Sequence, residues 1–502
     1  MRKAAPALSI RNRSLPAVCR PQPAQQRPSE TAGFSGISET EQRRITMVTT
    51  YKRILGASVF FMTACISVYA EYGSYRIPDS SEIRSGLVET WFEAPLNDVR
   101  ANRQELRRNS AGEQFQIRLE ESETTFSVFV SPQAELPVDV YSDKGKSTEM
   151  QSVYPGDAPG SWVLVRDKRS GNPLRIKYYF AKDSDVYVQF VPLKNNAYAD
   201  FIIFGGYASR QVPTGLPFAR FYTASFADVA SWTKNTLPWK YASQHTDMYH
   251  STLQMINVIR EKLPDLVYAD DAMYDENDEP VYISTGGRRG IPEEDADKIS
   301  LSSAGFVKWI ADGLVNPLSG SSLKRAPLLV RTVDNDPLGY QGIMSEKYST
   351  SFALDWTRNI AAAVLSVNAG RNYLYPQSGV DMTEEPFSAE LTADGIKNSV
   401  GYIKDNGYSA VVLKPLMYVF ASEYPGECYL AAVRETDRKA SPEVKVFNQC
   451  AILFPYFDTE GKFNCVVFRN GAESAIDDFC RNNSSNFIHL TRMKTSDKFF
   501  PL

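Results

Sequence analysis

Residues 115–130, FQIRLEESETTFSVFV, indicate the fold class of the first half of the chain. Their apolar residues occupy every second position in two runs separated by a polar turn: Phe115, Ile117 and Leu119, then Phe126, Val128 and Val130. Alternation of this kind is typical of strands with one buried face, because successive side chains of a strand point to opposite sides. The stretch therefore predicts two neighbouring β-strands.

The same pattern continues outward from this stretch, between about residues 113 and 205. Turns rich in Pro, Gly, Asp and Asn separate further short runs: Val138–Val140, Trp162–Val165, Arg175–Phe180, Val186–Val191 and Phe201–Phe204. Many short alternating strands at this spacing favour an all-β sandwich or barrel. We expect a helical segment between Ser81 and Arg108 to pack against it.

The period changes in the second half of the chain. Apolar residues from Met248 to Leu263 recur at close to 3.6 positions, which predicts an amphipathic helix that ends at Pro264. We therefore expect an α+β protein, with a sandwich-like β domain at residues 71–230 and an α+β domain at residues 231–502.

The segment at residues 47–70 has the organisation of a secretory signal. A basic pair precedes an apolar run that ends in Val68-Tyr69-Ala70, and small residues before the cut complete the pattern that a signal peptidase reads. We expect cleavage after Ala70. Two alternatives remain open: an uncleaved membrane anchor at 54–69, although a spanning helix needs roughly 20 apolar residues, and lipid attachment at Cys65.

The composition narrows the function classes. Residues 1–46 are rich in Arg, Pro, Gln and Ser without an apolar period, so we expect them to be disordered or untranslated. A net charge of -4 without a basic stripe argues against nucleic acid as a partner. The cysteines after the signal, Cys428, Cys450, Cys465 and Cys480, could form disulfides or remain buried thiols.

Four segments of the C-terminal half carry the residues with potential chemistry. They are a strand running into paired glycines at Tyr282–Gly287, a helix start at Ser302–Ile310, a turn into a strand at Pro425–Leu430, and a hairpin beginning at Asn448–Phe454. Paired glycines let backbone approach closely, and a hydroxyl residue commonly opens a helix. Their order along the chain is more informative than any one of them.

Together these segments resemble the NlpC-type cell-wall peptidases, papain-like enzymes that cleave peptides of peptidoglycan. In that family the segments read as tyrosine before paired glycines, Asp-Cys-Ser-Gly-Phe-Val, Pro-Gly-Asp-Leu and His-Val-Gly-Ile-Tyr-Leu. The resemblance covers roughly residues 275–495. It implies a papain-like domain with a substrate groove, in a protein that is periplasmic or attached to the bacterial cell envelope.

The catalytic positions of the family are replaced in this chain. Ser303 stands at the cysteine nucleophile, Gln449 at the histidine base, and Cys465 near the third, orienting residue. A serine hydroxyl lacks the easily lowered pKa of a thiol, and an amide takes up no proton near neutral pH, so it cannot activate a nucleophile. The spacing is also longer than the family's, which implies a helical insertion at about residues 316–424.

The resemblance therefore implies a pseudoenzyme that binds a peptidoglycan peptide or an envelope protein. The candidate ligand-binding residues are Tyr282, Gly286, Gly287, Ser303 and Gln449. Two alternatives remain, an active peptidoglycan hydrolase that uses Ser303 with His489 or another base, and a purely structural envelope scaffold. We expect no metal and no cofactor.

Structural interpretations compete with several of these assignments. Ser303 could serve as a helix N-cap, and His489 lies in an apolar run typical of a satisfied strand histidine. The cluster Asp355-Trp356-Arg358 in the insertion could be a salt-bridged core feature or a partner contact. The sequence does not decide between these two.

Overall fold

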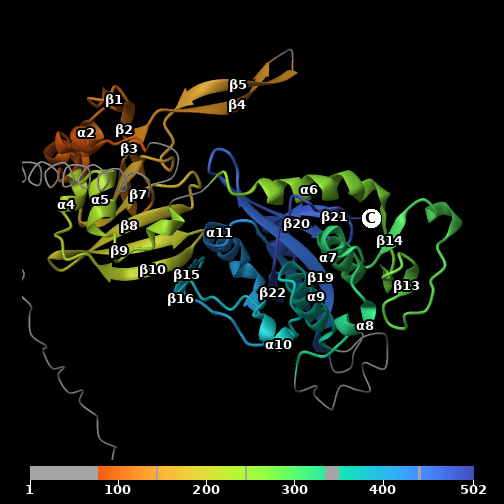
Figure 1. The fold of residues 1–502 in the computed structure, drawn as a ribbon. Helices are drawn as coiled ribbons and strands as arrows, with labels where there is room; N and C mark the ends of the chain where they lie inside the picture. The colour runs from red at the N-terminus through yellow and green to blue at the C-terminus, as the bar shows by residue number, and fades with distance from the viewer. Residues whose placement is uncertain (1–76, 143–144, 243–245, 334–349, 439–442, 502) are drawn as a thin grey trace, which may run out of the picture. The chain divides into compact units, whose positions relative to one another are not determined.

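The computed structural model describes residues 77–142, 145–242, 246–333, 350–438 and 443–501, all within one compact unit (Figure 1). The expected leader at 1–46, the signal at 47–70 and Cys65 lie outside these residues. The fold is a mixed α+β fold, with a large antiparallel sheet built mainly by the N-terminal half and most longer helices later in the chain. None of the described helices combines the length and apolar character needed to cross a bilayer.

The N-terminal half builds a ten-stranded antiparallel sheet whose first eight strands follow chain order. The strands are β1 (Glu105–Arg108), β2 (Gln114–Glu121), β3 (Thr125–Pro132), β6 (Trp162–Asp167), β7 (Pro173–Tyr178), β8 (Val186–Leu193), β9 (Asn196–Ile203), β10 (Gly206–Pro213), β15 (Ala389–Thr392) and β16 (Gly395–Asn398). The last two come from the expected insertion, since Gly206 of β10 pairs with Glu390 of β15. The stretch 115–130 forms β2 and β3, as its alternation predicted.

Helices, rather than a second sheet, cover one face of this sheet. They are α2 (Ser81–Ser85), η1 (Val88–Phe92), α3 (Leu96–Ala101), α4 (Arg220–Thr223) and α5 (Phe226–Trp232). Leu87, Trp91 and Phe221 share a core with the inward residues Ile117 and Trp162. The expected two-sheet sandwich is therefore corrected to one sheet with a helical layer, because these short helices supply the apolar side chains that a second sheet would have supplied.

Strands β4 (Ala134–Ser142) and β5 (Gly145–Val153) form a separate two-stranded hairpin (Figure 1). All residues of β5 before its last are exposed to solvent. An isolated two-stranded ribbon is marginally stable in water. The hairpin therefore adds little to the cores of the two large sheets.

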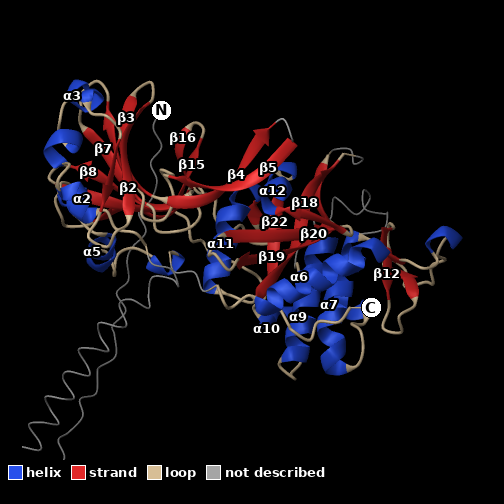
Figure 2. Cartoon of the chain, turned by 90° about the horizontal axis from the view of Figure 1, so that it is seen from above, coloured by secondary structure: helices blue, strands red, loops and turns tan. Residues whose placement is uncertain are grey.

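The C-terminal half builds a six-stranded antiparallel sheet with helices on both faces (Figure 2). Its order is β17 (Tyr408–Ser409), β22 (Phe487–Lys494), β18 (Glu427–Asp437), β19 (Val444–Phe457), β20 (Phe463–Arg469) and β21 (Ala472–Ala475). One face packs against α6 (His250–Lys262), α7 (Ser303–Ser319) and α9 (Phe352–Asn368), and the other against α11 (Leu413–Glu423) and α12 (Ile476–Asn482). We call these the α7 face and the α11 face.

Strand pleating assigns side chains to the two faces. Cys428, Leu430 and Ala432 of β18 join the core of the α7 face, whereas the intervening Tyr429 and Ala431 join the core of the α11 face. The helices expected around 248–263, 302–314 and 355–365 are present as α6, α7 and α9. Pro264 lies in the short turn η3 (Leu263–Asp265) that follows α6, as the sequence predicted.

Smaller elements complete the C-terminal half. They are η2 (Trp239–Tyr241), β11 (Leu266–Tyr268) paired with β14 (Ile299–Leu301), the hairpin β12 (Ala272–Tyr274) and β13 (Pro280–Tyr282), η4 (Glu293–Asp295), α8 (Arg325–Leu328), α10 (Tyr375–Ser378) and η6 (Ala410–Val412). Of these, the hairpin β12–β13 matters most for the site, because it lies against the first turn of α7.

Candidate functional site

Ser302, not Ser303, caps the N-terminus of α7. Its Oγ accepts a hydrogen bond from the backbone N of Gly305 at 3.1 Å, and its backbone is extended with ψ 176°. An N-cap side chain reaches the amide two or three residues ahead. Ser303 is thus the first residue inside the helix, which corrects its interpretation as the cap.

The first turn of α7 lies unusually close to β12. The backbone N and the Oγ of Ser302 both donate to the carbonyl of Ala272, at 2.9 and 3.1 Å. A Cβ on Gly305 would lie 2.1 Å from that same oxygen, so no larger residue fits without moving the helix. This contact gives a structural reason for the glycine of the Gly305-Phe306-Val307 motif.

Ser303 contacts β19, the strand that carries Gln449. Its Oγ accepts a hydrogen bond from the backbone N of Cys450 at 3.3 Å, and only 5% of the residue is exposed. The structure therefore brings the two motif segments together, helix start against strand. The hydroxyl is already engaged by a main-chain donor rather than by a basic side chain.

The side chain of Gln449 lies on the opposite face of the sheet. Gln449 pairs with Val433, and Val433 and Ala451 belong to the core of the α11 face. Cys450 belongs to the α7 face, and burial raises the pKa of its thiol. The β19 residue that faces α7 is thus a protonated thiol, and the buried Oε1 of Gln449 has no hydrogen-bond partner within the described residues.

Cys465 is also separated from Ser303 by the sheet. It pairs with Pro455 on β20 and joins the core of the α11 face together with Val467. Burial raises the pKa of this thiol well above its usual value. All four cysteines of the C-terminal half are free thiols, and three of them are buried.

Tyr282 and the paired glycines form a turn next to α7. Tyr282 is 40% exposed and pairs with Ala272, whose carbonyl accepts the bonds from Ser302. Gly286 has φ +72°, and a Cβ there would lie 2.9 Å from Nη1 of Arg325. The glycines shape the turn, while Tyr282 is an exposed side chain of this hairpin.

A buried ionic cluster lies at α9 and β22, and it unites Arg358 and His489, which the sequence indicated only separately. Arg358 is 1% exposed, and its Nη2 donates to Asp381 Oδ2 at 2.7 Å and to Asp405 Oδ1 at 2.8 Å. His489 Nε2 lies 3.3 Å from both Arg358 Nη2 and Asp381 Oδ2. Tyr375 Oη donates to Asp381 at 2.8 Å. We call these residues the Arg358 cluster.

The protonation states of the cluster follow from burial and charge. Burial alone would raise the pKa of Asp381, but the hydrogen bond with His489 and the charge of Arg358 hold it at about 2. Burial lowers the pKa of His489, against the opposing pull of Asp381. The cluster therefore holds a cation, an ionised Asp381 carboxylate and a neutral imidazole whose Nδ1 has no hydrogen-bond partner among the described residues.

His489 is distant from the start of α7. His489 and Cys450 both pair with Ala432, from the two sides of β18. Because neighbouring strands lie about 4.8 Å apart, the backbones of His489 and Cys450 are separated by about 10 Å. The imidazole is 0% exposed and engaged with Arg358, so it is not arranged as a base for Ser303.

The motif Asp355-Trp356-Arg358, left undecided by the sequence, is a core feature. Asp355 Oδ1 accepts from the backbone N of Thr332 at 2.7 Å, and Trp356 Nε1 donates to the carbonyl of Ala304 at 2.9 Å. Arg358 forms the ion pairs above. Asp381 carried no sequence signal, because it lies in an irregular segment distant in sequence from its partners.

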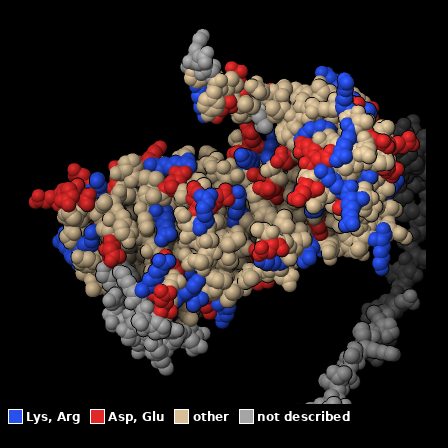
Figure 3. Space-filling view, turned by 180° about the vertical axis from the view of Figure 1, so that it is seen from behind, with Lys and Arg blue, Asp and Glu red and all other residues tan. Residues whose placement is uncertain are grey.

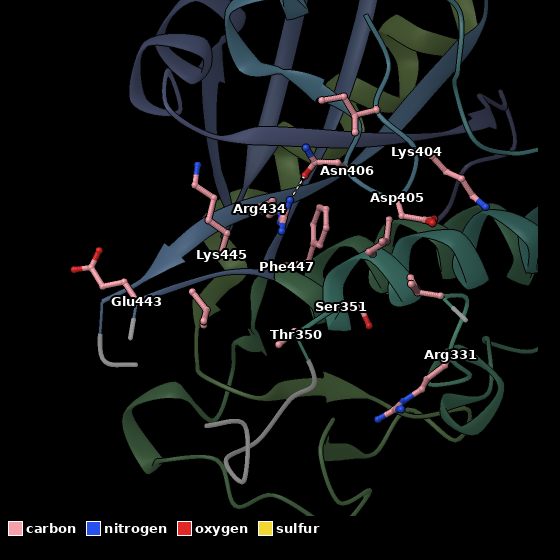
Figure 4. A pocket seen from close by; sticks show the side chains of 14 residues that line it. Arg331, Thr350, Ser351, Lys404, Asp405, Asn406, Arg434, Glu443, Lys445 and Phe447 are labelled. Atoms are coloured by element: carbon pink, nitrogen blue, oxygen red, sulfur yellow. Dashed lines mark hydrogen bonds between the residues drawn. The ribbon is translucent and has the colours of Figure 1, made fainter. Parts of the chain in front are cut away.

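A cavity of about 500 Å³ lies beside the Arg358 cluster (Figure 4). The start of α9, the segment Ile403–Asn406 and the paired ends of β18 and β19 line it. Asp405 belongs both to the cluster and to the cavity wall. Asn406 Oδ1 accepts a hydrogen bond from Arg434 Nη1 at 2.6 Å. Six charged side chains line this cavity, two of them acidic and four basic.

Comparison with known proteins bears on the N-terminal half. Residues 73–241 match the model of a family described as "Domain of unknown function (DUF8515)". The matched range includes strands β1–β10 and helices α2–α5, and it ends before α7 and the Arg358 cluster. No curated protein and no solved structure matches the chain.

Proposed function

We propose that this chain is an exported protein of the bacterial cell envelope whose C-terminal half is papain-like and binds a peptidoglycan peptide or an envelope protein without cleaving it. One observation carries the proposal: Ser303 Oγ is buried and accepts from the backbone N of Cys450. Amide cleavage by a hydroxyl needs a base within hydrogen-bond reach. Cys450, which faces α7 from β19, is a thiol whose pKa burial raises.

The papain-like assignment rests on the order of the motifs together with their contacts. A helix begins at Ser303 against β19, and β19 lies between β18, which follows Pro425-Gly426, and β20. This is the arrangement that the NlpC-type motifs imply, with the helix start beside the strand of the missing base. It supports a papain-like helix start that has lost its catalyst.

Export rests on the signal-like segment at 47–70 of the sequence. The charge pattern agrees with a partner other than nucleic acid, because Figure 3 shows basic and acidic side chains interspersed over the face in view. The exposed hairpin β4–β5 favours a second role for the N-terminal half, attachment to another envelope component. A purely structural scaffold would use that hairpin alone and leave the C-terminal half without a ligand.

A hydrolysis assay tests the absence of catalysis. Peptidoglycan fragments are incubated with the wild-type chain, with Ser303→Ala and with Ser303→Cys, and the products are followed by mass spectrometry. We expect no cleavage by any of them, because neither a hydroxyl nor a thiol at position 303 meets an imidazole. Cleavage by the wild type that disappears in Ser303→Ala would establish the hydrolase alternative.

A retention assay tests binding. The chain from Glu71 onward is mixed with purified cell-wall sacculi, and a Tyr282→Ala variant serves as the groove variant, with Tyr268→Ala, an exposed tyrosine on β11, as the matched control. We expect retention that Tyr282→Ala reduces and Tyr268→Ala does not. Absence of retention, together with failure to recover an envelope partner, would leave the scaffold alternative.

A further inference from the structure

The cavity beside the Arg358 cluster has the features of a ligand site separate from the Ser303 position. We propose that it binds the C-terminal carboxylate of a short peptide, with the guanidinium of Arg434 as the anchor. The inference rests on the proposed function in one respect, that the chain holds its ligand without cleaving it. The charge, geometry and rigidity of the cavity wall support it.

The cavity wall is cationic in a protein that is acidic overall. Its charged residues are Arg331, Lys404, Arg434, Lys445, Asp405 and Glu443. Four cations against two anions give 4 − 2 = +2, whereas the whole chain carries -4. Asp405 pairs with Arg358 at 2.8 Å, and Arg358 also pairs with Asp381 at 2.7 Å, so the neighbouring charges of Arg358 and Asp381 cancel and leave the sum at +2.

Arg434 presents the geometry that a carboxylate requires. Its Nη1 donates to Asn406 at 2.6 Å, and its Cζ lies 5.9 Å from the centre of the Phe447 ring. Figure 4 shows the guanidinium beside the Phe447 ring, with its hydrogen bond to Asn406 drawn as a dashed line. Its remaining N–H groups form no hydrogen bond with the described residues, and a planar guanidinium pairs with a carboxylate through two parallel bonds.

The loop that holds Asn406 in place is rigid. Ile403 and Gly407 exchange two backbone hydrogen bonds, at 3.0 and 2.8 Å, and Asp405 adopts the left-handed conformation with φ +55°. A Cβ on Gly407 would lie 2.1 Å from the carbonyl of Ile488. Strained backbone that persists in this way is common at binding sites, where it fixes the geometry before the ligand arrives.

The rest of the wall selects among anions. Apolar side chains form much of it: Val333, Leu354, Ile403, Val444 and Phe447. A phosphate dianion would meet the carboxylates of Asp405 and Glu443 without using this apolar surface. A volume of about 500 Å³ falls within the range of about 300–1,000 Å³ of small-molecule sites. A peptide end with an apolar side chain next to its carboxylate uses both parts of the wall.

Calorimetric titration of the full chain tests the assignment with three probes. They are an acetylated tripeptide ending in leucine with a free carboxylate, the same tripeptide as its C-terminal amide, and inorganic phosphate. Loss of a charged hydrogen-bonded pair weakens binding about 10- to 100-fold. We expect that reduction for the amide, no displacement of the acid by phosphate, and the intact tripeptide recovered afterwards.

Two variants identify the anchor. Arg434→Gln should weaken binding of the free acid about 10- to 100-fold. The matched control Arg481→Gln removes the same charge from an exposed pair with Asp478 and should leave binding unchanged. Lys404 is exposed, and its ammonium has no partner in the part of the chain that the structure describes. Lys404→Gln therefore keeps the fold and should weaken binding about two- to fivefold at low salt.

The outcomes separate this inference from the proposed function. Equal affinity for acid and amide, or unchanged binding in both Arg434→Gln and Lys404→Gln, would overturn the carboxylate site, and so would phosphate that displaces the tripeptide. Binding of the acid by a chain that sacculi do not retain would keep the site and reject the cell-wall ligand. Retention on sacculi without binding of the acid would keep the cell-wall ligand and reject the carboxylate site.

Discussion

Two polar sites on the α7 face of the six-stranded sheet differ in chemistry. At the α7 start, Ser302 and Ser303 make neutral hydrogen bonds to the main chain of Ala272 and Cys450. At the Arg358 cluster, a buried guanidinium pairs with two carboxylates beside an imidazole. Of the three positions that resemble the peptidase family's catalytic residues, only Ser303 lies at the neutral site, while the charges lie about two strands away.

The two sites show that the place where a helix packs on a strand and the reactivity of the side chains there are independent properties. A helix start packed on a strand can persist as a structural contact after the groups needed for catalysis are gone, because capping and close backbone packing stabilise it on their own. Buried charges need complete pairing, since an unpaired one costs several kcal/mol. We therefore expect the Arg358 cluster to dominate stability and the α7 start to depend on shape.

The largest expected effect is at the Arg358 cluster. Arg358→Met leaves the partly buried carboxylates of Asp381 and Asp405 without their cation, which should lower the free energy of unfolding by about 3 kcal/mol, the lower end for breaking a buried pair. Chemical denaturation measures it. The matched control, Arg481→Met at an exposed pair, should change stability by less than about 0.5 kcal/mol. Similar small losses in both variants would show that the cluster is not the stronger site.

The next effect, of similar size, tests shape at the α7 start. Alanine is favoured over glycine by about 1 kcal/mol inside a helix, but a Cβ on Gly305 would lie 2.1 Å from the oxygen of Ala272. Gly305→Ala should therefore destabilise the protein by about 3 kcal/mol, the upper end for over-packing. Gly290→Ala, where a Cβ meets nothing within 4 Å, is the control. Stabilisation by Gly305→Ala would contradict this close contact.

Local sequence patterns predicted the elements that this comparison uses. The alternation at 115–130 predicted β2 and β3, and the serines before an apolar run predicted α7, because both signals act over a few residues. The sequence assigned the N-cap of α7 to Ser303, whereas the structure assigns it to Ser302, because either hydroxyl fits the sequence pattern. Only the reach of Ser302 Oγ to the amide of Gly305 decides between them.

Features that depend on distant residues were missed. The sandwich expectation failed because helices from separate segments cover the ten-stranded sheet, and no local period reveals which surface covers which. The side on which Gln449 lies depends on how β19 pairs: Gln449 pairs with Val433 next to Cys450, whose side chain faces α7, so Gln449 points away from α7. Asp381 and Asp405 meet Arg358 only through the fold.

The third prediction concerns pH and His489. Burial lowers the pKa of His489 below 6.5, so on acidification the unfolded chain takes up this proton before the folded chain does. Stability should therefore fall as the pH drops below about 6.5, and His489→Gln should remove that part of the slope. Denaturation at several pH values measures it, with the exposed His250→Gln as control. An equal slope in wild type and His489→Gln would place the cause elsewhere.

The smallest effect is expected at Ser303 itself. Ser303→Ala leaves the amide of Cys450 without its acceptor, and a single hydrogen bond of this kind contributes about 1 kcal/mol. The control Ser147→Ala, on the exposed strand β5, should be neutral within about 0.5 kcal/mol. A modest loss of stability with unchanged ligand binding would make Ser303 a packing residue. A large loss of retention on sacculi with unchanged stability would instead make Ser303 a ligand contact, beside Tyr282, at the α7 start.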